Sequence, residues 1–188
     1  MFDNFLPTPD FRECHDWVIA ASAKRVLDCA ARFQIRQDPA LRLALAVREL
    51  PGRRLGRQPA RPFDMDSFVD LGREGDSWLG FGLVGAFWQA GFGLVRCASR
   101  HEFLTLRRAD VCRLVLSFRV AQIGYRTVRL ITETSIFCPM SATRRRFAPY
   151  WYLIRPVSGA MRRRTLANIS RQACQPGGCA NGGCREAA

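Results

Sequence analysis

The sequence predicts an α+β fold in which a curved antiparallel sheet wraps around one long C-terminal helix. Residues 63–137 consist mostly of short runs with an apolar side chain at every second position, which is the period of a β-strand. Residues 141–171 instead repeat apolar side chains every three or four positions, as an amphipathic helix does. Consecutive strands followed by a helix are typical of an α+β domain.

The N-terminal part predicts an arm, a first strand and two short helices. Residues 1–14 form the arm, and residues 15–21 alternate well enough for a strand. Ser22 is a suitable N-cap for a helix over residues 23–33. The pair Asp38-Pro39 starts a second short helix, because proline is favoured at the first helical position.

The uncharged segment "WLGFGLVGAFWQAGFGLV" (78–95) raises the question of a membrane span. Its length is close to the roughly 20 residues that a spanning helix needs. However, Leu79 and Phe81 alternate with Gly80 and Gly82, and each glycine would cost about 1 kcal/mol inside a helix. The alternation predicts two strands of a soluble sheet, with large side chains on one face and space on the other.

A hairpin and a long helix complete the predicted domain. The runs "VCRLVLSFRVA" (111–121) and "TVRLITETSIF" (127–137) flank a turn at Gly124-Tyr125. Four side chains on the first run share one face, which we expect to be buried: Leu114, Leu116, Phe118 and Val120.

The terminal helix, from about Ser141 to Arg171, contains Pro149 and Pro156, and each proline should kink it. The domain therefore spans residues 15–171, and the Gly- and Cys-rich residues 172–188 are expected to be a disordered tail.

The composition fits one domain with a strong positive charge. The 188 residues carry a formal net charge of +13, and every basic residue except Lys24 is arginine. The preference for arginine over lysine is typical of a GC-rich coding sequence. The positive electrostatic field nevertheless attracts anionic partners, whatever its origin. Arg144, Arg155 and Arg162 fall near one line of an ideal helix, which would suit RNA or an anionic lipid surface. The prolines disturb this line and no nucleic-acid motif is present, so nucleic-acid binding is not expected.

The sequence predicts a cytoplasmic protein without a metal or cofactor. The start "MFDNFLPTPDFRECHD" lacks the basic and apolar regions of a secretory signal, and no segment is predicted to span the membrane. Cys174, Cys179 and Cys184 lie five residues apart, unlike the closer pairs of most metal sites. The oligomeric state does not follow from the sequence.

Several segments resemble the START-like superfamily, also called SRPBCC, which includes polyketide cyclases and proteins like the birch-pollen allergen. The similar pieces are "GLVGAFW" (82–88), "FRV" (118–120), "TET" (132–134) and "RRFAPYWYLIRPVSGAMRRRTLANISR" (145–171). The resemblance, to an uncharacterised bacterial branch, covers roughly residues 15–171, and the last piece is its most specific part. It implies a helix-grip fold, a curved sheet around a terminal helix with a hydrophobic pocket between them. It implies no single activity. Pro149 within the helix departs from the family pattern.

The candidate ligand-binding residues are mainly aromatic. As a group they favour a partly open apolar site, although each taken singly also fits a closed core: Phe81, Trp88, Phe92, Phe118, Tyr150 and Trp151, together with Ile154. Arg96 is expected either to clamp the acidic head group of a ligand or to be solvated. Glu133 either faces the pocket as an acid or base, or pairs with Arg119 on the neighbouring strand, which we favour.

Three functions are compatible with the sequence. The first is binding of a small hydrophobic or amphipathic molecule between the sheet and the terminal helix. The second is an enzyme of the cyclase or aromatase type acting on a polyketide-like substrate, which requires Glu133, His101 or Tyr150 to point inward. The third is a basic surface that binds RNA or anionic lipid. We expect the first, and we assign no catalytic residue.

Overall fold

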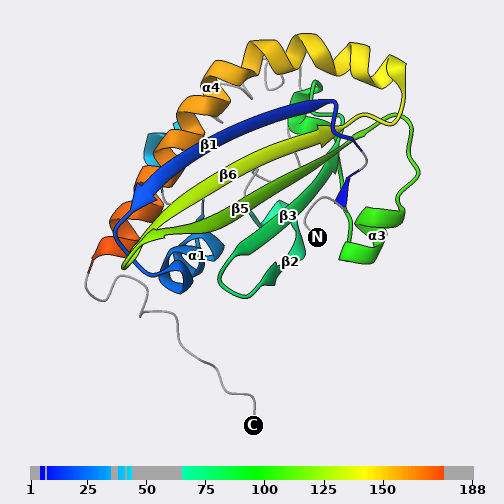
Figure 1. The fold of residues 1–188 in the computed structure, drawn as a ribbon. Coiled ribbons are helices and arrows are strands. Elements are labelled where there is room, and N and C mark those ends of the chain that lie inside the picture. The colour runs from blue at the N-terminus through cyan, green and yellow to red at the C-terminus, as the bar shows by residue number, and fades with distance from the viewer. Residues whose placement is uncertain (1–4, 7, 35–37, 41, 44–64, 176–188) are drawn as a thin grey trace.

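The computed structural model describes residues 5–6, 8–34, 38–40, 42–43 and 65–175, and confirms an α+β fold with an antiparallel sheet and a long C-terminal helix (Figure 1). The strands alternate apolar and polar residues as predicted. The elements are β1 (Phe11–Ile19), α1 (Ala23–Ala31), β2 (Val69–Glu74), β3 (Trp78–Gly85), β4 (Leu94–Val95), α3 (Arg100–Thr105), β5 (Cys112–Gly124), β6 (Thr127–Phe137) and α4 (Ser141–Cys174), with short 3-10 turns at Met65–Ser67 and Ala90–Gly93.

The six-stranded sheet has the order β1-β6-β5-β3-β2, and β4 pairs with β3. All the pairs are antiparallel. The first strand therefore lies beside the last one, and it forms an edge of the sheet. Figure 1 shows α4 arching along the β1 side of the sheet, with α1 near its C-terminal end. We call the sheet face toward α1 and α4 the inner face.

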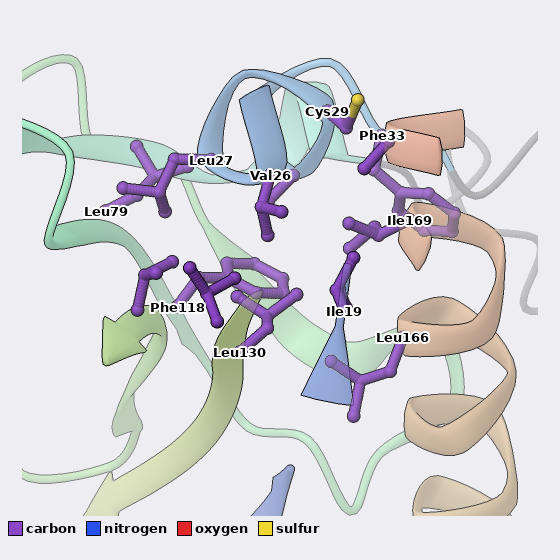
Figure 2. Packing of buried hydrophobic residues seen from close by; sticks show 14 of the residues in the cluster. Ile19, Val26, Leu27, Cys29, Phe33, Leu79, Phe118, Leu130, Leu166 and Ile169 are labelled. Atoms are coloured by element: carbon purple, nitrogen blue, oxygen red, sulfur yellow. The ribbon is translucent and has the colours of Figure 1, made fainter. Parts of the chain in front are cut away.

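One half of the core joins α1, the sheet and the C-terminal half of α4 (Figure 2). Val26 and Leu27 of α1 point toward Phe118 and Leu130 of the sheet. The β5 face predicted to be buried is the inner face, since Leu116, Phe118 and Val120 all belong to this cluster. From α4 the cluster receives Leu166, Ile169 and Ala173.

The other half of the core joins the opposite end of the sheet to the first turns of α4. Phe147 is 1% exposed and lies at the centre of a group of aromatic rings. Its ring centroid is 5.1 Å from that of Phe11 and 6.0 Å from that of Trp151. Ile136 and Phe87 complete this contact. Helix α4 is therefore fastened to the sheet near both of its ends.

Helix α4 is continuous although Pro149 and Pro156 lie inside it. Both prolines are exposed, and Figure 1 shows the helix curving over the sheet. Proline on the solvent side favours such curvature, because the missing backbone hydrogen bonds lie on the convex side. Val157 follows the three- and four-residue spacing of apolar side chains in this helix, but it is 43% exposed.

Two glycines of β3, Gly80 and Gly82, lie on the outer face of the sheet, away from α4. Gly80 and Gly82 pair with Ser117 and Val115 of β5, which share that face. The space above them is filled: a Cβ at Gly80 would lie 2.2 Å from the Trp78 ring, and one at Gly82 would lie 2.8 Å from Phe103. The predicted space therefore accommodates Trp78 and helix α3, while Leu79, Phe81 and Leu83 of β3 lie on the inner face.

Several boundaries differ from the predicted ones. Strand β1 begins at Phe11 rather than residue 15, and buried Phe5 of the arm packs on the outer face of the sheet, where its ring stacks on Trp78. The second short helix is present at residues 39–40 and 42–43, where Asp38 caps Ala40 through a hydrogen bond of 2.9 Å. The rest of that helix and the predicted tail after residue 175 lie outside the described residues. No helix in the described residues is both long and apolar enough to cross a membrane.

Leu166→Ala should destabilise the fold, because Leu166 is fully buried between α4, α1 and the sheet. We expect the free energy of unfolding to fall by about 2–5 kcal/mol in urea denaturation. Leu153→Ala is the matched control on the same helix, since Leu153 is 79% exposed. Equal effects of the two substitutions would contradict the described packing of α4.

Candidate functional site

A cavity of about 170 Å³ lies between the inner face of the sheet and α4. It occupies the middle of the interface, between the two contacts that fasten α4 to the sheet. Its walls come from β3, β5 and β6, from α4, and from the segments before β2 and after β3. The lining residues are Phe33, Met65, Phe68, Leu83, Phe87, Phe92, Leu114, Leu116, Phe118, Thr134, Ile136, Phe147, Tyr150, Trp151, Ile154, Ser158, Met161, Arg162 and Thr165.

The wall of the cavity is mainly aromatic and aliphatic. Such a surface binds apolar molecules by removing both surfaces from water, and aromatic rings add edge-to-face contacts. The strands provide Leu114, Leu116 and Phe118, and α4 provides Tyr150 and Trp151. The period-two pattern of β5 thus supplies three wall residues from consecutive inward positions.

The backbone at Phe92 is strained. Its φ of 67° lies in the left-handed region, which a bulky residue rarely adopts. The 3-10 turn Ala90–Gly93 holds this geometry, and it contacts the sheet closely: a Cβ at Gly85 would lie 2.8 Å from the Phe92 carbonyl oxygen. The strain places the Phe92 ring in the cavity wall. The second strand predicted here is reduced to the two residues of β4, because this turn occupies its place.

One side of the cavity is polar, and Arg162 is its charged member. Thr134, Ser158 and Thr165 line the cavity with it. Among the described residues, Arg162 forms no hydrogen bond or salt bridge. Burial lowers the pKa of the Arg162 guanidinium to about 10, and the nearby Glu13 carboxylate acts against this shift. The folded protein therefore carries a poorly solvated positive charge at neutral pH.

Glu13 and His15 form a polar pair on the inner face of β1. Their side chains are joined at 2.9 Å between Glu13 Oε1 and His15 Nε2. Glu13 is 8% exposed, and α4 comes close at Gly159, where a Cβ would lie 3.1 Å from Glu13 Oε1. Glu13 Oε2 and Thr132 Oγ1 are buried and without a hydrogen-bond partner. These orphan atoms mark a polar region between β1, β6 and α4.

The structure brings five of the predicted site residues together at the cavity: Phe92, Phe118, Tyr150, Trp151 and Ile154.

Three further predicted residues lie outside the cavity wall. The ring of Phe81 contacts that of Phe118 at a centroid distance of 6.5 Å. Trp88 contacts Phe147 at 6.4 Å. Both therefore contact residues of the cavity wall without lining the cavity themselves. Arg96 follows the short strand β4 and is exposed, so it does not occupy the head-group position considered for it.

Glu133 lies on the outer face of the sheet, opposite the cavity. Its Oε1 accepts hydrogen bonds of 2.8 Å from Arg12 and from Ser135, and its Oε2 lies 3.7 Å from Arg119 Nη2. The register pairs Glu133 with Ser117 of β5, which fixes its side chain on the outer face. The cross-strand ion pair is therefore present, and Glu133 does not line the cavity.

The described wall of the cavity contains no carboxylate, imidazole or thiol. His101 lies in α3 and is exposed. The buried thiols of Cys112 and Cys138 are 3.2 Å apart beside the aromatic contact of α4. The hydrogen bond between Cys112 and Cys138, together with burial, raises the pKa of Cys112, which makes it a poor nucleophile. Of the groups proposed for catalysis, only Tyr150 borders the cavity.

Sequence reasoning missed Arg162 as a site residue. On an ideal helix it shares a line with Arg144 and Arg155, and those two are exposed. Arg162 instead lies four residues after Ser158 and eight after Ile154, which both line the cavity. This spacing indicated that Arg162 lies on the same side of α4 as the residues that line the cavity. Glu13 was missed because the first strand was predicted to begin at residue 15, and His15 was missed because a lone histidine at a strand start is usually structural or solvated.

Comparisons with models of known protein families, with curated protein sequences and with solved structures find no match to this chain. Within the described residues, no group of three or more His, Cys, Asp or Glu side chains is arranged to hold a metal ion.

Arg162→Met should stabilise the ligand-free protein. Burial lowers the pKa of the Arg162 guanidinium to about 10. Below that pH the side chain is charged, so the folded state carries a desolvation penalty that methionine removes. We expect the free energy of unfolding to rise by about 1–3 kcal/mol at pH 7 in urea denaturation. Arg163→Met, at an exposed neighbouring position, should change it by less than about 0.5 kcal/mol. A marked loss of stability in Arg162→Met would instead assign the guanidinium a structural role.

Proposed function

We propose that this chain is a helix-grip domain that binds a small hydrophobic or amphipathic molecule in the cavity between the sheet and α4. The observation that carries the proposal is the aromatic wall enclosing about 170 Å³ with one desolvated cation at its side. Cavities with mainly apolar walls and few polar groups are characteristic of small-molecule sites.

The architecture supports the helix-grip assignment in two respects. The sheet order places β1 beside β6, and α4 crosses the inner face as a single long helix. The resemblance to the START-like superfamily implies the same arrangement of a terminal helix over a curved sheet. The cavity lies where that resemblance places a ligand.

Binding is better supported than catalysis. General acid–base chemistry requires a titratable group within reach of the reacting atoms, and Tyr150 is the only candidate from the sequence that lines the cavity. A cyclase or aromatase of this fold would therefore depend on Tyr150 alone among those candidates. A carrier or sensor needs no such group, and the wall already provides what binding requires.

Ser158→Leu should abolish ligand binding by filling the cavity. Ser158 lines the cavity from α4, and a larger apolar side chain there occupies the empty space. We expect 4-fluorotoluene, detected by ¹⁹F NMR, to bind the unsubstituted protein and to lose at least tenfold in affinity with the variant.

Ala160→Leu is the matched control, because Ala160 is exposed on the same helix. It should bind the probe as the unsubstituted protein does, and circular dichroism should show that both variants are folded. If the unsubstituted protein binds neither 4-fluorotoluene nor any molecule retained in native mass spectrometry, the proposed function is wrong.

A second candidate function is docking of the outer side of α4 on an anionic membrane. Residues 141–174 contain no acidic side chain. Leu153 and Tyr152 are 79% and 66% exposed in the middle of the helix, and Arg145 and Arg163 are exposed on either side. Exposed apolar side chains flanked by arginines favour a lipid surface over RNA, because they can enter the headgroup region.

The double variant Tyr152→Ser/Leu153→Ser should lose binding to vesicles that contain phosphatidylglycerol. Co-sedimentation should fall at least fivefold relative to the unsubstituted protein, and pure phosphatidylcholine vesicles should bind neither. Val18→Ser, at an exposed position on β1, should bind as before. Retention of RNA with equal salt dependence in the double variant would favour a nucleic-acid surface and contradict membrane docking.

A further inference from the structure

We propose that the ligand of the cavity is a monocyclic aromatic carboxylate, whose anionic group forms a salt bridge with Arg162. This inference rests on the proposed function, because it names the chemical class of molecule that the same cavity takes.

The first argument is the charge of Arg162. The guanidinium lines the cavity and forms no salt bridge with a described residue. Arg162 is half-buried in a mainly apolar wall, where a charge is costly unless it is paired and hydrogen-bonded, so an anionic ligand supplies the direct partner that the described residues do not. A carboxylate matches the planar fork of donors on a guanidinium and can accept two parallel hydrogen bonds. An apolar ligand without a charge would leave the cation unpaired.

The second argument concerns how many negative charges the ligand carries. Glu13 is the acidic group whose field reaches Arg162, and its Oε1 is already paired with His15. The negative charge of Glu13 repels any ligand anion beside Arg162, and it repels a dianion more strongly than a monoanion. This selects a carboxylate over a phosphate dianion. The hydroxyls of Ser158 and Thr165 line the same cavity and can donate to a carboxylate oxygen.

The third argument is the size and shape of the cavity. An apolar cavity of about 150 Å³ in a protein interior accommodates benzene, and the cavity here has about 170 Å³. One aromatic ring therefore fits within this volume. The rings of Phe118, Phe147 and Trp151 surround the space, and aromatic walls favour an aromatic guest through edge-to-face contacts.

The test compares 4-fluorophenylacetate with its neutral isostere 4-fluorophenylacetamide by ¹⁹F NMR titration. The unsubstituted protein should bind the acid at least tenfold more tightly than the amide. In Arg162→Met this preference should disappear, while 4-fluorotoluene still binds and shows that the cavity is intact. Arg163→Met, the exposed neighbour, should keep the full preference for the acid.

The outcomes separate the two proposals. If 4-fluorotoluene, the acid and the amide all fail to bind, the proposed function is wrong. If 4-fluorotoluene binds but the acid is no better than the amide, or if Arg162→Met keeps the preference, the carboxylate assignment is overturned and cavity binding stands. If octanoate displaces the probe at lower concentration than phenylacetate does, the ligand is an aliphatic acid and the ring assignment is overturned.

Discussion

The structure depends on the attachment of α4 to the sheet at two separate places. Near its start, Phe147 and Trp151 pack against the aromatic group around Phe11. Near its end, Leu166 and Ile169 pack against α1 and the sheet. The helix between these contacts is bent over the inner face and carries smaller or longer side chains, such as Ser158 and Arg162. Two tight contacts with a looser middle leave a cavity that dense packing would otherwise remove.

The polar region at and beside this cavity lowers the stability of the fold. A desolvated guanidinium, an unpartnered carboxylate oxygen on Glu13 and an unpartnered hydroxyl on Thr132 lie in the same region. Buried polar atoms in folded proteins are nearly always hydrogen-bonded, so exceptions that cluster need an explanation. A purely structural interface would have used apolar side chains at these positions. Clusters of buried polar atoms without hydrogen-bond partners are typical of functional sites.

The sequence was informative wherever one periodicity ran without interruption. Strands β5 and β6 followed from alternation, and α4 followed from its three- and four-residue spacing, because each pattern reflects one buried face. The wall residues Phe118, Tyr150 and Trp151 could therefore be predicted.

The predictions that were wrong concerned which face of a strand or helix is covered by an element distant in the sequence. The glycines of β3 indicated free space, but the pattern could not show that α3 would fill it. Helix α3 itself had a signal that was overlooked, since Ser99 accepts a hydrogen bond from the Glu102 amide, the arrangement of a capping box. Arg162 was missed because it was grouped with the exposed Arg144 and Arg155 in one basic line, although its spacing from Ser158 and Ile154 indicated the cavity side of α4.

The pairing of β1 with β6 has a consequence for synthesis of the chain. Residues 11–19 hydrogen-bond to residues 128–136, so the N-terminal strand leaves the ribosome long before its partner exists. Contacts between such distant segments slow folding, because the intervening chain must first be ordered. Neither the sheet edge nor the floor under α4 is complete until the last strand has emerged. The nascent chain must therefore keep its apolar strands from aggregating until residues 128–136 have emerged.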